Sequence, residues 1–502
     1  MPYKLLTILL LAGSPLVAKT YYVSPEGKLV NKGTRESPLP FEYFERPKNH
    51  AGDTFLVMEG QYPGHWITRI YGEKNRPVII KSEHWLGADL IGVQEKRENT
   101  RKILQIKGSY SWFIDFEIYD TEAFNRISNS GEAFFCSDGV HLMGTESKVI
   151  NCVAHDVLIG FSTWASSVAG EIYGCLAYNI GWNNLKSSRK SKGHGHGYYV
   201  QNKANQDTYK KMVLNIVWGT ASEGFHAYTQ KGNIENFHLE NNLAYNLIGY
   251  NQNRTPGRGF ILGGYQPVSG LRFINNHAYK VAVQLGYGAN YPIISKNVVF
   301  DNNYLVGSNI GLYHLAEVKS FTNNFIVTRD PMLTAVQALG KSERTWQWPF
   351  KDNKIYVSNS TATSHPRIGM QELTVGGTKY ISLTQSEWKN NTNQVIRTTP
   401  ASEAFLYQNK YDPDRALVFI YNFKEMDSFP VEMGKFLQNG EKFEVRDIEN
   451  IHKVVHEGIY QDQPVNFTMN LTELAPIHGN LPREHAKHSD KGFNAFLIRK
   501  IN

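Results

Sequence analysis

Short apolar runs, each broken by Gly, Asn or Ser, repeat through the middle of this chain of 502 residues. The runs alternate apolar and polar positions, as β-strands do, and no stretch keeps the apolar spacing of an amphipathic helix over ten or more residues. Six copies contain a glycine followed by a large apolar or aromatic residue: Gly160-Phe161, Gly197-Tyr198, Gly224-Phe225, Gly259-Phe260, Gly286-Tyr287 and Gly311-Leu312. A repeat of roughly 20–40 residues without helices between the copies predicts a solenoid of the parallel β-helix type.

A second column of the repeat is rich in asparagine. It is formed by Asn215, Asn242, Asn276, Asn303 and Asn324. Equivalent positions of stacked coils lie about 4.8 Å apart, so we expect these side chains to form an interior ladder of hydrogen-bonded amides. Cys152 and Cys175 occupy the same slot in two earlier copies. We expect them to stack as small buried side chains, with a disulfide between them as the alternative.

The pattern changes after about residue 398, and this change divides the chain. Strand-like runs such as 416–422 and 493–498 follow there, separated by charged turns and without the repeat. We therefore expect an all-β fold, with a parallel β-helix over residues 19–395 and a small antiparallel β-sandwich over residues 396–502. The sandwich is expected to pack on the end of the solenoid, as a cap or as an accessory domain that binds carbohydrate.

The N-terminus is typical of a secretory signal peptide. Residues 1–18 contain Lys4, an apolar run over 5–12 and the ending Leu16-Val17-Ala18. This segment predicts a secreted or periplasmic protein. No other stretch approaches the roughly 18 apolar residues of a spanning helix, so we expect no membrane span.

The charge and the aromatic content indicate the kind of partner. The net charge is +7, and 13% of the residues are aromatic. In an exported protein, a basic surface with many rings favours an acidic polysaccharide as partner, although the charge also has a simpler interpretation as an aid to solubility. Nucleic acid is not expected, because the chain has no dense Lys/Arg block and no recognisable binding module. We expect a monomer.

The first coils resemble those of a known fold family. The segments are Tyr21-Tyr22-Val23-Ser24-Pro25, Gly52-Asp53-Thr54 and Arg76-Pro77-Val78-Ile79-Ile80. They resemble the alginate lyase and chondroitinase B branch of the pectate-lyase-like superfold, and the likeness covers roughly residues 21–395. The resemblance implies a right-handed parallel β-helix that acts on polysaccharides, in a superfold that hosts lyases, hydrolases, epimerases and binding proteins. The lysine base, the arginine and the calcium-binding carboxylates of that branch match no motif here, so their roles are not carried over.

Alignment of the coils on their glycines places further columns on one outer wall. The residue before each glycine gives the column Asp138, Ile159, His196, Glu223 and Arg258. The second residue after it gives His141, Ser162, Tyr199, His226, Ile261 and Tyr313, and the fourth gives Trp164, Gln201 and Tyr228. The residue directly after each glycine is mostly apolar and should point inward, which leaves the second and the fourth residue after the glycine outward. We therefore expect a polar and aromatic groove on one face of the coils over residues 197–260.

The groove carries the three kinds of side chain that a β-eliminating lyase needs. Such an enzyme neutralises a uronate carboxylate, removes the C5 proton and protonates the leaving oxygen. We assign these tasks to Arg258, to His196 or His226, and to Tyr199 or Tyr228, with Glu223 orienting an imidazole. The predicted catalytic residues are therefore His196, Tyr199, Glu223, His226 and Arg258. The predicted substrate-binding residues are His194, Gln201, Tyr228, Trp164, Tyr313 and His141.

Two other interpretations of these residues stay open. His196, Glu223 and Arg258 could form a stacked ion network at a bend. His194, His196 and His226 with Glu223 could ligate zinc or a softer ion. The sequence requires no cofactor, and it leaves calcium or another divalent ion open although no calcium-loop motif is readable.

The function predicted from these residues is that of a secreted enzyme that cleaves a uronate-containing or sulfated glycan by β-elimination. A glycoside hydrolase on an anionic polysaccharide is the first alternative, and a non-catalytic carbohydrate-binding solenoid is the second. A glycosidase needs two carboxylates roughly 5–9.5 Å apart. Asp138 and Glu223 are three strands apart, at about 14 Å, and do not qualify.

Overall fold

The computed structural model describes residues 18–93, 102–121, 126–128, 136–184, 192–228, 233–247, 257–264, 268–286, 296–308, 310–313, 318–328, 336–339, 350–357, 368–374, 377–382, 392–478 and 487–501. Except for its last residue, the expected signal peptide over residues 1–18 lies outside this range. No helix in the described part of the chain is long and apolar enough to cross a membrane.

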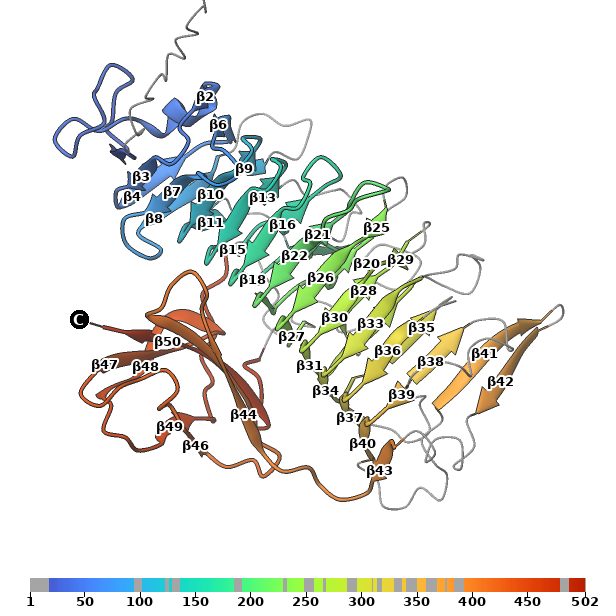
Figure 1. The fold of residues 1–502 in the computed structure, drawn as a ribbon. Helices are drawn as coiled ribbons and strands as arrows, with labels where there is room; N and C mark the ends of the chain where they lie inside the picture. The colour runs from blue at the N-terminus through green and yellow to red at the C-terminus, as the bar shows by residue number, and fades with distance from the viewer. Residues whose placement is uncertain are drawn as a thin grey trace, which may run out of the picture.

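The chain winds into three long sheets that run side by side along one axis (Figure 1). Successive strands pass from sheet 1 to sheet 2 to sheet 3 and then return, so each sheet receives one strand per coil. Neighbouring strands are parallel, except for the final pair of sheet 3. The prediction of an all-β fold built on a parallel β-helix is therefore confirmed.

Sheet 1 consists of β1 (Thr20–Val23), β3 (Thr54–Val57), β7 (Val78–Ser82), β10 (Ser111–Ile114), β14 (Lys148–Ile150), β17 (Glu171–Tyr173), β22 (Lys210–Val213), β26 (Phe237–Glu240), β30 (Arg272–Ile274), β33 (Val298–Asp301), β36 (Val318–Thr322) and β39 (Phe350–Lys351). Sheet 2 consists of β4 (Gly60–Pro63), β8 (Ala88–Gly92), β11 (Glu117–Asp120), β15 (Val153–His155), β18 (Leu176–Tyr178), β23 (Ile216–Val217), β27 (Leu243–Tyr245), β31 (His277–Tyr279), β34 (Tyr304–Val306), β37 (Phe325–Thr328), β40 (Lys354–Val357) and β43 (Gln394–Ile396).

Sheet 3 consists of β5 (Trp66–Thr68), β9 (Lys102–Ile106), β13 (Asp138–Leu142), β16 (Ile159–Thr163), β21 (His196–Val200), β24 (Glu223–Ala227), β28 (Gly257–Leu262), β32 (Val281–Leu285), β35 (Ile310–Tyr313), β38 (Val336–Leu339), β41 (Ile368–Thr374) and β42 (Gly377–Ser382). Short elements decorate the coils: η1 (Phe41–Glu45), β2 (Lys48–Asn49), β6 (Ile70–Tyr71), β12 (Ile127–Ser128), β19 (Trp182–Asn184), β20 (Lys192–His194), β25 (Ile234–Glu235) and β29 (Val268–Ser269).

The interior of the solenoid contains the predicted asparagine ladder. The amide of Asn242 donates to Oδ1 of Asn276 at 2.9 Å, and the amide of Asn303 donates to Oδ1 of Asn324 at 2.9 Å. The ladder continues through Asn353 and Asn393, which the sequence pattern missed. Each of these amides also satisfies backbone groups at a bend, so the column holds the coils in register.

Two further interior columns agree with the sequence pattern. Phe161, Tyr198, Phe225 and Phe260 are fully buried and stack on one another in turn. Cys152 and Cys175 are buried and free, so they stack as predicted and the alternative of a disulfide is wrong.

The C-terminal strands form a five-stranded antiparallel sheet and a two-stranded antiparallel sheet. The larger contains β44 (Glu403–Gln408), β45 (Arg415–Tyr421), β50 (Phe493–Lys500), β47 (Lys442–Asp447) and β48 (Asn450–Ile459), and the smaller contains β46 (Ser428–Val431) and β49 (Val465–Thr468). Side chains from both sheets meet in one apolar core, for example where Phe467 contacts Phe496 at a ring distance of 5.0 Å. This is the expected small β-sandwich.

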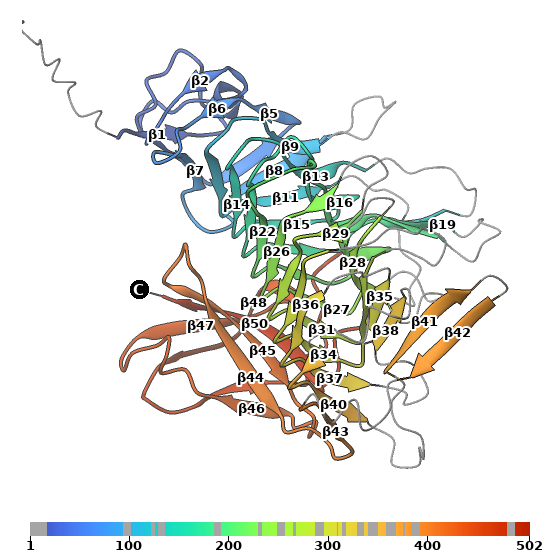
Figure 2. The same ribbon diagram turned by 45° about the vertical axis from the view of Figure 1, so that its right-hand side comes forward.

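The position of the sandwich differs from the prediction. It lies along the flank of the solenoid, over sheet 2, and not on its end (Figures 1 and 2). The indole of Trp218 donates to the carbonyl of Ile448 at 3.0 Å, and Tyr279 stacks on Phe493 at 4.7 Å. The cause is the row of large side chains that sheet 2 presents outward, which only a second apolar surface can bury.

Candidate functional site

Three neighbouring strands of sheet 3 bring the predicted catalytic residues together. His196 on β21 pairs with Glu223 on β24, and Glu223 pairs with Arg258 on β28. Tyr199 pairs with His226 across the same two strands as the first pair. These five side chains are called the sheet 3 cluster below. His196 contacts the rings of Tyr199 and His226, so these side chains share the outer face although His196 lies two positions before the buried Tyr198. Strict alternation would turn His196 inward, but Gly197 and Tyr198 are both buried and interrupt it.

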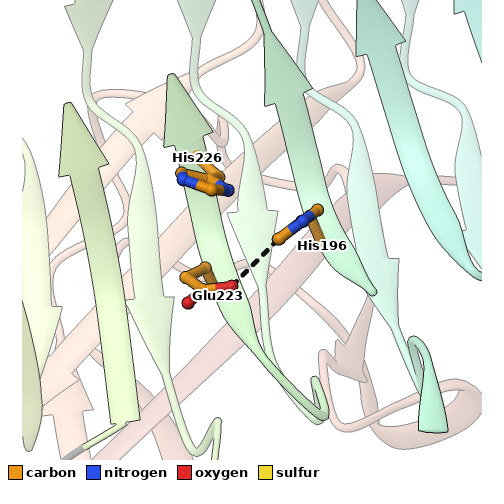
Figure 3. A group of neighbouring side chains, drawn as sticks. All are labelled: His196, Glu223 and His226. Atoms are coloured by element: carbon orange, nitrogen blue, oxygen red, sulfur yellow. Dashed lines mark ion pairs between the residues drawn. The ribbon is translucent and has the colours of Figure 1, made fainter. Parts of the chain in front are cut away.

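Glu223 is the centre of the cluster. Its side chain is 8% exposed, with Oε2 3.1 Å from Nδ1 of His196 and Oε1 3.4 Å from Nη1 of Arg258. The hydroxyl of Ser222 donates to Oε2 as well. Nδ1 of His196 lies at this distance from Oε2 without the geometry of a hydrogen bond. Figure 3 shows Glu223 facing His196 from the adjacent strand, with His226 beside them.

Burial and neighbouring charges shift the pKa values of three groups in the cluster, Glu223, His226 and Tyr199. Burial alone would raise the pKa of Glu223, but the interactions with His196 and His226 and the Ser222 bond outweigh it and lower that pKa below its usual range. Burial, together with the nearby charges of His196 and Arg258, lowers the pKa of His226 to about 3. Burial raises the pKa of Tyr199. The cluster therefore holds a carboxylate, an uncharged imidazole and a protonated phenol at neutral pH.

Aromatic rings flank the two imidazoles. Tyr199 stacks on His196 with ring centroids 5.0 Å apart and an interplanar angle of 18°. Tyr228 stacks on His226 at 5.0 Å and 26°. The two imidazole centroids are 4.6 Å apart. Such half-buried rings with polar tips are typical of surfaces on which sugar rings pack.

The remaining predicted substrate-binding residues divide into two groups. Trp164 is 46% exposed beyond the end of β16, and Gln201 interacts with the Tyr199 hydroxyl, so both extend the surface of the cluster. His141 is 4% exposed, and its Nδ1 lies 2.8 Å from the hydroxyl of Ser162. Its expected contact with substrate is therefore not supported. His141 packs against the ring of Trp164 at 5.3 Å and supports that side chain from below.

His194 does not join the cluster in the described structure. His194 lies on β20, in a lateral hairpin with β19, and stacks on Trp182 at 4.4 Å. The glycines on either side of His194 allow this close approach, because the hairpin backbone passes Gly181 and Ala221. The backbone of Tyr313 belongs to β35, and the register there corrects the predicted column, because Gly311 and not Tyr313 is in line with Gln284 and Ile261. The side chain of Tyr313 lies outside the described residues.

Sequence reasoning missed Lys210, a buried residue next to this surface. Its side chain is 1% exposed, and Nζ donates to the carbonyls of Trp164 at 2.7 Å and Gln201 at 2.6 Å. Burial lowers its pKa well below the usual range. A lysine at the start of a strand is normally exposed, so the hydrophobic and polar pattern of the sequence did not indicate that Lys210 is buried. Lys210 ties together the chain segments that carry two predicted substrate-binding residues.

Asp138 and Glu223 do not lie close enough together to act as the two carboxylates of a glycosidase. Asp138 lies on β13 and pairs with Nζ of Lys102 at 2.9 Å. Between it and Glu223 lie β16 and β21, which gives a separation of about 14 Å at the usual strand spacing. The expectation that this pair fails as a hydrolytic pair agrees with the observed strand order.

Three of the four candidate metal ligands come together. His196, Glu223 and His226 each offer one ligand atom, and these atoms lie within 4.8 Å of one another. His194 is directed at Trp182 and does not belong to this group.

Comparison with known proteins gives matches in structure alone. No protein-family model matches the chain, and no curated protein sequence does. The chain is similar to a rhamnogalacturonan lyase, with 16% identity, a TM-score of 0.43, and coverage of 76% of this chain and 87% of that chain. It is similar to the GH136 lacto-N-biosidase from Eubacterium ramulus, with 12% identity, a TM-score of 0.44, and coverage of 76% and 68%.

A third similar structure is a mannuronic acid specific polysaccharide family 6 lyase enzyme from human gut microbiota. Its identity is 13%, its TM-score is 0.41, and the match covers 76% of this chain and 92% of that chain. At these identities and TM-scores the matches carry no argument about function, which has to be judged from the residues of the cluster.

Proposed function

We propose that this protein is an exported enzyme that cleaves a uronate-containing polysaccharide by β-elimination at the sheet 3 cluster. One observation carries the proposal: the Glu223 carboxylate contacts both the imidazole of His196 and the guanidinium of Arg258. The phenol of Tyr199 packs on the same imidazole. Base and acid thus lie together on β21, and the carboxylate-neutralising cation lies on β28, two strands away.

His196 suits the role of base. Nδ1 faces Glu223, so the Nδ1–H tautomer is favoured and the lone pair of Nε2 is left for the substrate. A carboxylate that holds a histidine in this way also stabilises the imidazolium that forms when the proton is taken. Arg258 is 43% exposed at its side chain and can therefore turn toward a bound uronate carboxylate.

The proposed β-elimination needs no reactant other than the polysaccharide and the side chains of the cluster. Nε2 of His196 takes the C5 proton, and the electrons of the C5–H bond form a C4=C5 double bond. The C4–O4 bond breaks, and the hydroxyl of Tyr199 gives its proton to O4. Arg258 and the uncharged His226 stabilise the negative charge that develops on the substrate carboxylate, which is the usual source of most rate enhancement.

A panel of acidic polysaccharides tests the proposal. The proposed enzyme produces oligosaccharides whose C4=C5 double bond, conjugated with the carboxylate, absorbs ultraviolet light. New reducing ends without this absorbance would instead identify a hydrolase. Saturable binding without any new reducing end would identify a carbohydrate-binding protein.

A further inference from the structure

The sheet 3 cluster has the composition of a metal site. One oxygen and two imidazole nitrogens, from Glu223, His196 and His226, lie within 4.8 Å of one another. In a tetrahedral site with bonds of 2.0–2.2 Å, ligand atoms lie about 3.4 Å apart. The pair formed by His196 Nδ1 and Glu223 Oε2, at 3.1 Å, already has nearly this spacing. Figure 3 shows the third side chain, His226, on the strand that also carries Glu223.

Both imidazoles have a buried nitrogen without a hydrogen-bond partner. Nδ1 of His196 and Nδ1 of His226 are the atoms concerned. A buried polar atom of this kind is unfavourable unless something binds it, and a lone pair on nitrogen suits a cation. His196 offers the lone pair of Nδ1 in the tautomer that carries its proton on Nε2, which is the tautomer opposite to the one that acts as base. The two atoms belong to two of the three residues whose ligand atoms lie within 4.8 Å of one another, so one ion can bind both residues.

The ligand set fits a transition metal better than calcium. Two histidines and one glutamate with an open fourth position form a common zinc site, whereas calcium prefers six or more oxygen atoms. The two oxygens of Glu223 have different partners: Oε2 faces His196, and Oε1 faces Arg258. Binding of a metal through Oε2 therefore does not require Arg258 to leave.

We propose that His196, Glu223 and His226 bind one divalent transition-metal ion, with zinc as the best fit, and that the bound ion inhibits the enzyme. A metal on Nδ1 of His196 holds the imidazole in the tautomer with its proton on Nε2, so Nε2 can no longer take the C5 proton, and the metal also fixes Glu223 in place. The inhibition rests on the proposed function, whereas the metal binding does not.

Calorimetric titration of the EDTA-treated, desalted full-length protein with zinc chloride tests the binding. We expect one site with a dissociation constant on the order of micromolar or tighter. His226→Ala and Glu223→Gln should each weaken binding at least about tenfold. His226→Ala is the cleaner variant, because Nδ1 of His226 has no hydrogen bond to lose. Melting curves verify that both variants fold.

Two control variants separate the cluster from general zinc binding. His238→Ala removes a histidine that is paired with Glu240 at 2.7 Å on sheet 1, and it should leave both zinc affinity and activity unchanged. Tyr199→Phe should lose activity but keep zinc affinity, since the phenol is not a ligand. Unchanged zinc affinity in folded His226→Ala and Glu223→Gln would overturn the metal site.

Activity measurements test the inhibition. Zinc at concentrations above the dissociation constant should stop the release of unsaturated product, and EDTA should restore it. Stimulation by zinc would overturn the inhibitory role and make the ion a cofactor. If no polysaccharide yields unsaturated product, the proposed function and the inhibition fail together, and the calorimetric result still decides whether the metal site exists.

Discussion

At the scale of single residues, Glu223 determines how the cluster works. Its carboxylate contacts a histidine and an arginine that lie far away in the sequence, and only the register of three strands brings them together. The sequence predicts this row, because glycines mark the same position on the five successive strands β13, β16, β21, β24 and β28. The burial of His141 and Lys210 was not predictable, since it depends on how the chain folds beyond each strand.

Replacement of Arg258 by alanine should lower kcat at least about a hundredfold, because the substrate carboxylate loses its neutralising cation. The melting temperature should stay unchanged, since the Arg258 side chain is 43% exposed. Steady-state kinetics and thermal melting are the measurements. Arg272→Ala, an exposed arginine on sheet 1, is the matched control. Retained activity with a lower melting temperature would show that Arg258 belongs to a structural ion network.

Replacement of Lys210 by methionine should lower the free energy of unfolding by about 2 kcal/mol, because the buried carbonyls of Trp164 and Gln201 lose their donor. It should also raise KM more than it lowers kcat, since both residues are expected to bind substrate. Urea denaturation and kinetics measure the two effects. The exposed neighbour Lys211→Met should change neither. A stabilised Lys210→Met protein would mean that the cost of burying the charge exceeds the value of its bonds.

At the scale of elements, the asparagine ladder sets the alignment of the coils. The sequence predicted five rungs, because Asn-Asn pairs mark four of them. It missed Asn353 and Asn393, where the preceding residue is Asp352 or Thr392 in place of asparagine. Both preceding residues adopt positive φ, at 57° and 61°, as the asparagines do elsewhere. The backbone bend is therefore the same in these two coils, but the residue before the ladder asparagine is not itself an asparagine, so the Asn-Asn pattern does not mark it.

Replacement of Asn276 by alanine should destabilise the protein by about 3 kcal/mol, because a rung in the middle of the ladder loses several buried hydrogen bonds at once. Chemical denaturation measures this. Asn275→Gly is the neighbouring control and should cost little, since Asn275 has a φ of 55° that glycine adopts readily. Equal losses for both variants would contradict a special role of the ladder.

At the scale of the whole molecule, the sandwich is held to sheet 2 by buried charges as well as by aromatic rings. His155 lies 2.6 Å from Asp156 and 3.1 Å from Glu117, and His452 of the sandwich lies 2.7 Å from Glu117. Arg126 pairs with Asp156. The sequence did not place the sandwich here, although the tyrosines after Ala177, Ala244 and Ala278 point outward from sheet 2 and need a cover.

This interface predicts a stability optimum in pH. Burial opposes a charge on His155, but Asp156 and Glu117 outweigh it and raise the pKa of His155 to about 9, while the histidine contacts lower the pKa of Glu117 to about 2. Stabilisation by charged His155 is complete below its unfolded pKa of about 6.5 and is lost as the pH rises through about 9. Stabilisation by Glu117 is complete above about 4.3 and is lost as the pH falls through about 2.

The melting temperature should therefore be highest between about pH 5 and 6.5 and should fall toward pH 9. His155→Gln should lower the melting temperature at pH 6 and flatten the fall on the alkaline side. Thermal melting across pH measures this. His65→Gln, a partly buried histidine near β5 that contacts only backbone carbonyls in the described structure, is the control. An equally steep alkaline fall in His155→Gln would contradict the assignment.

The flank position of the sandwich also restricts how such a protein can evolve. Solenoids gain or lose whole coils by duplication or deletion where each coil touches only its neighbours. Here the sandwich contacts Trp85, between β7 and β8, and Phe325 on β37, so an inserted coil between them would displace one set of contacts by about 4.8 Å. Lineages of this protein should vary in length before β7 or after β37, while the number of coils between these strands is inherited unchanged.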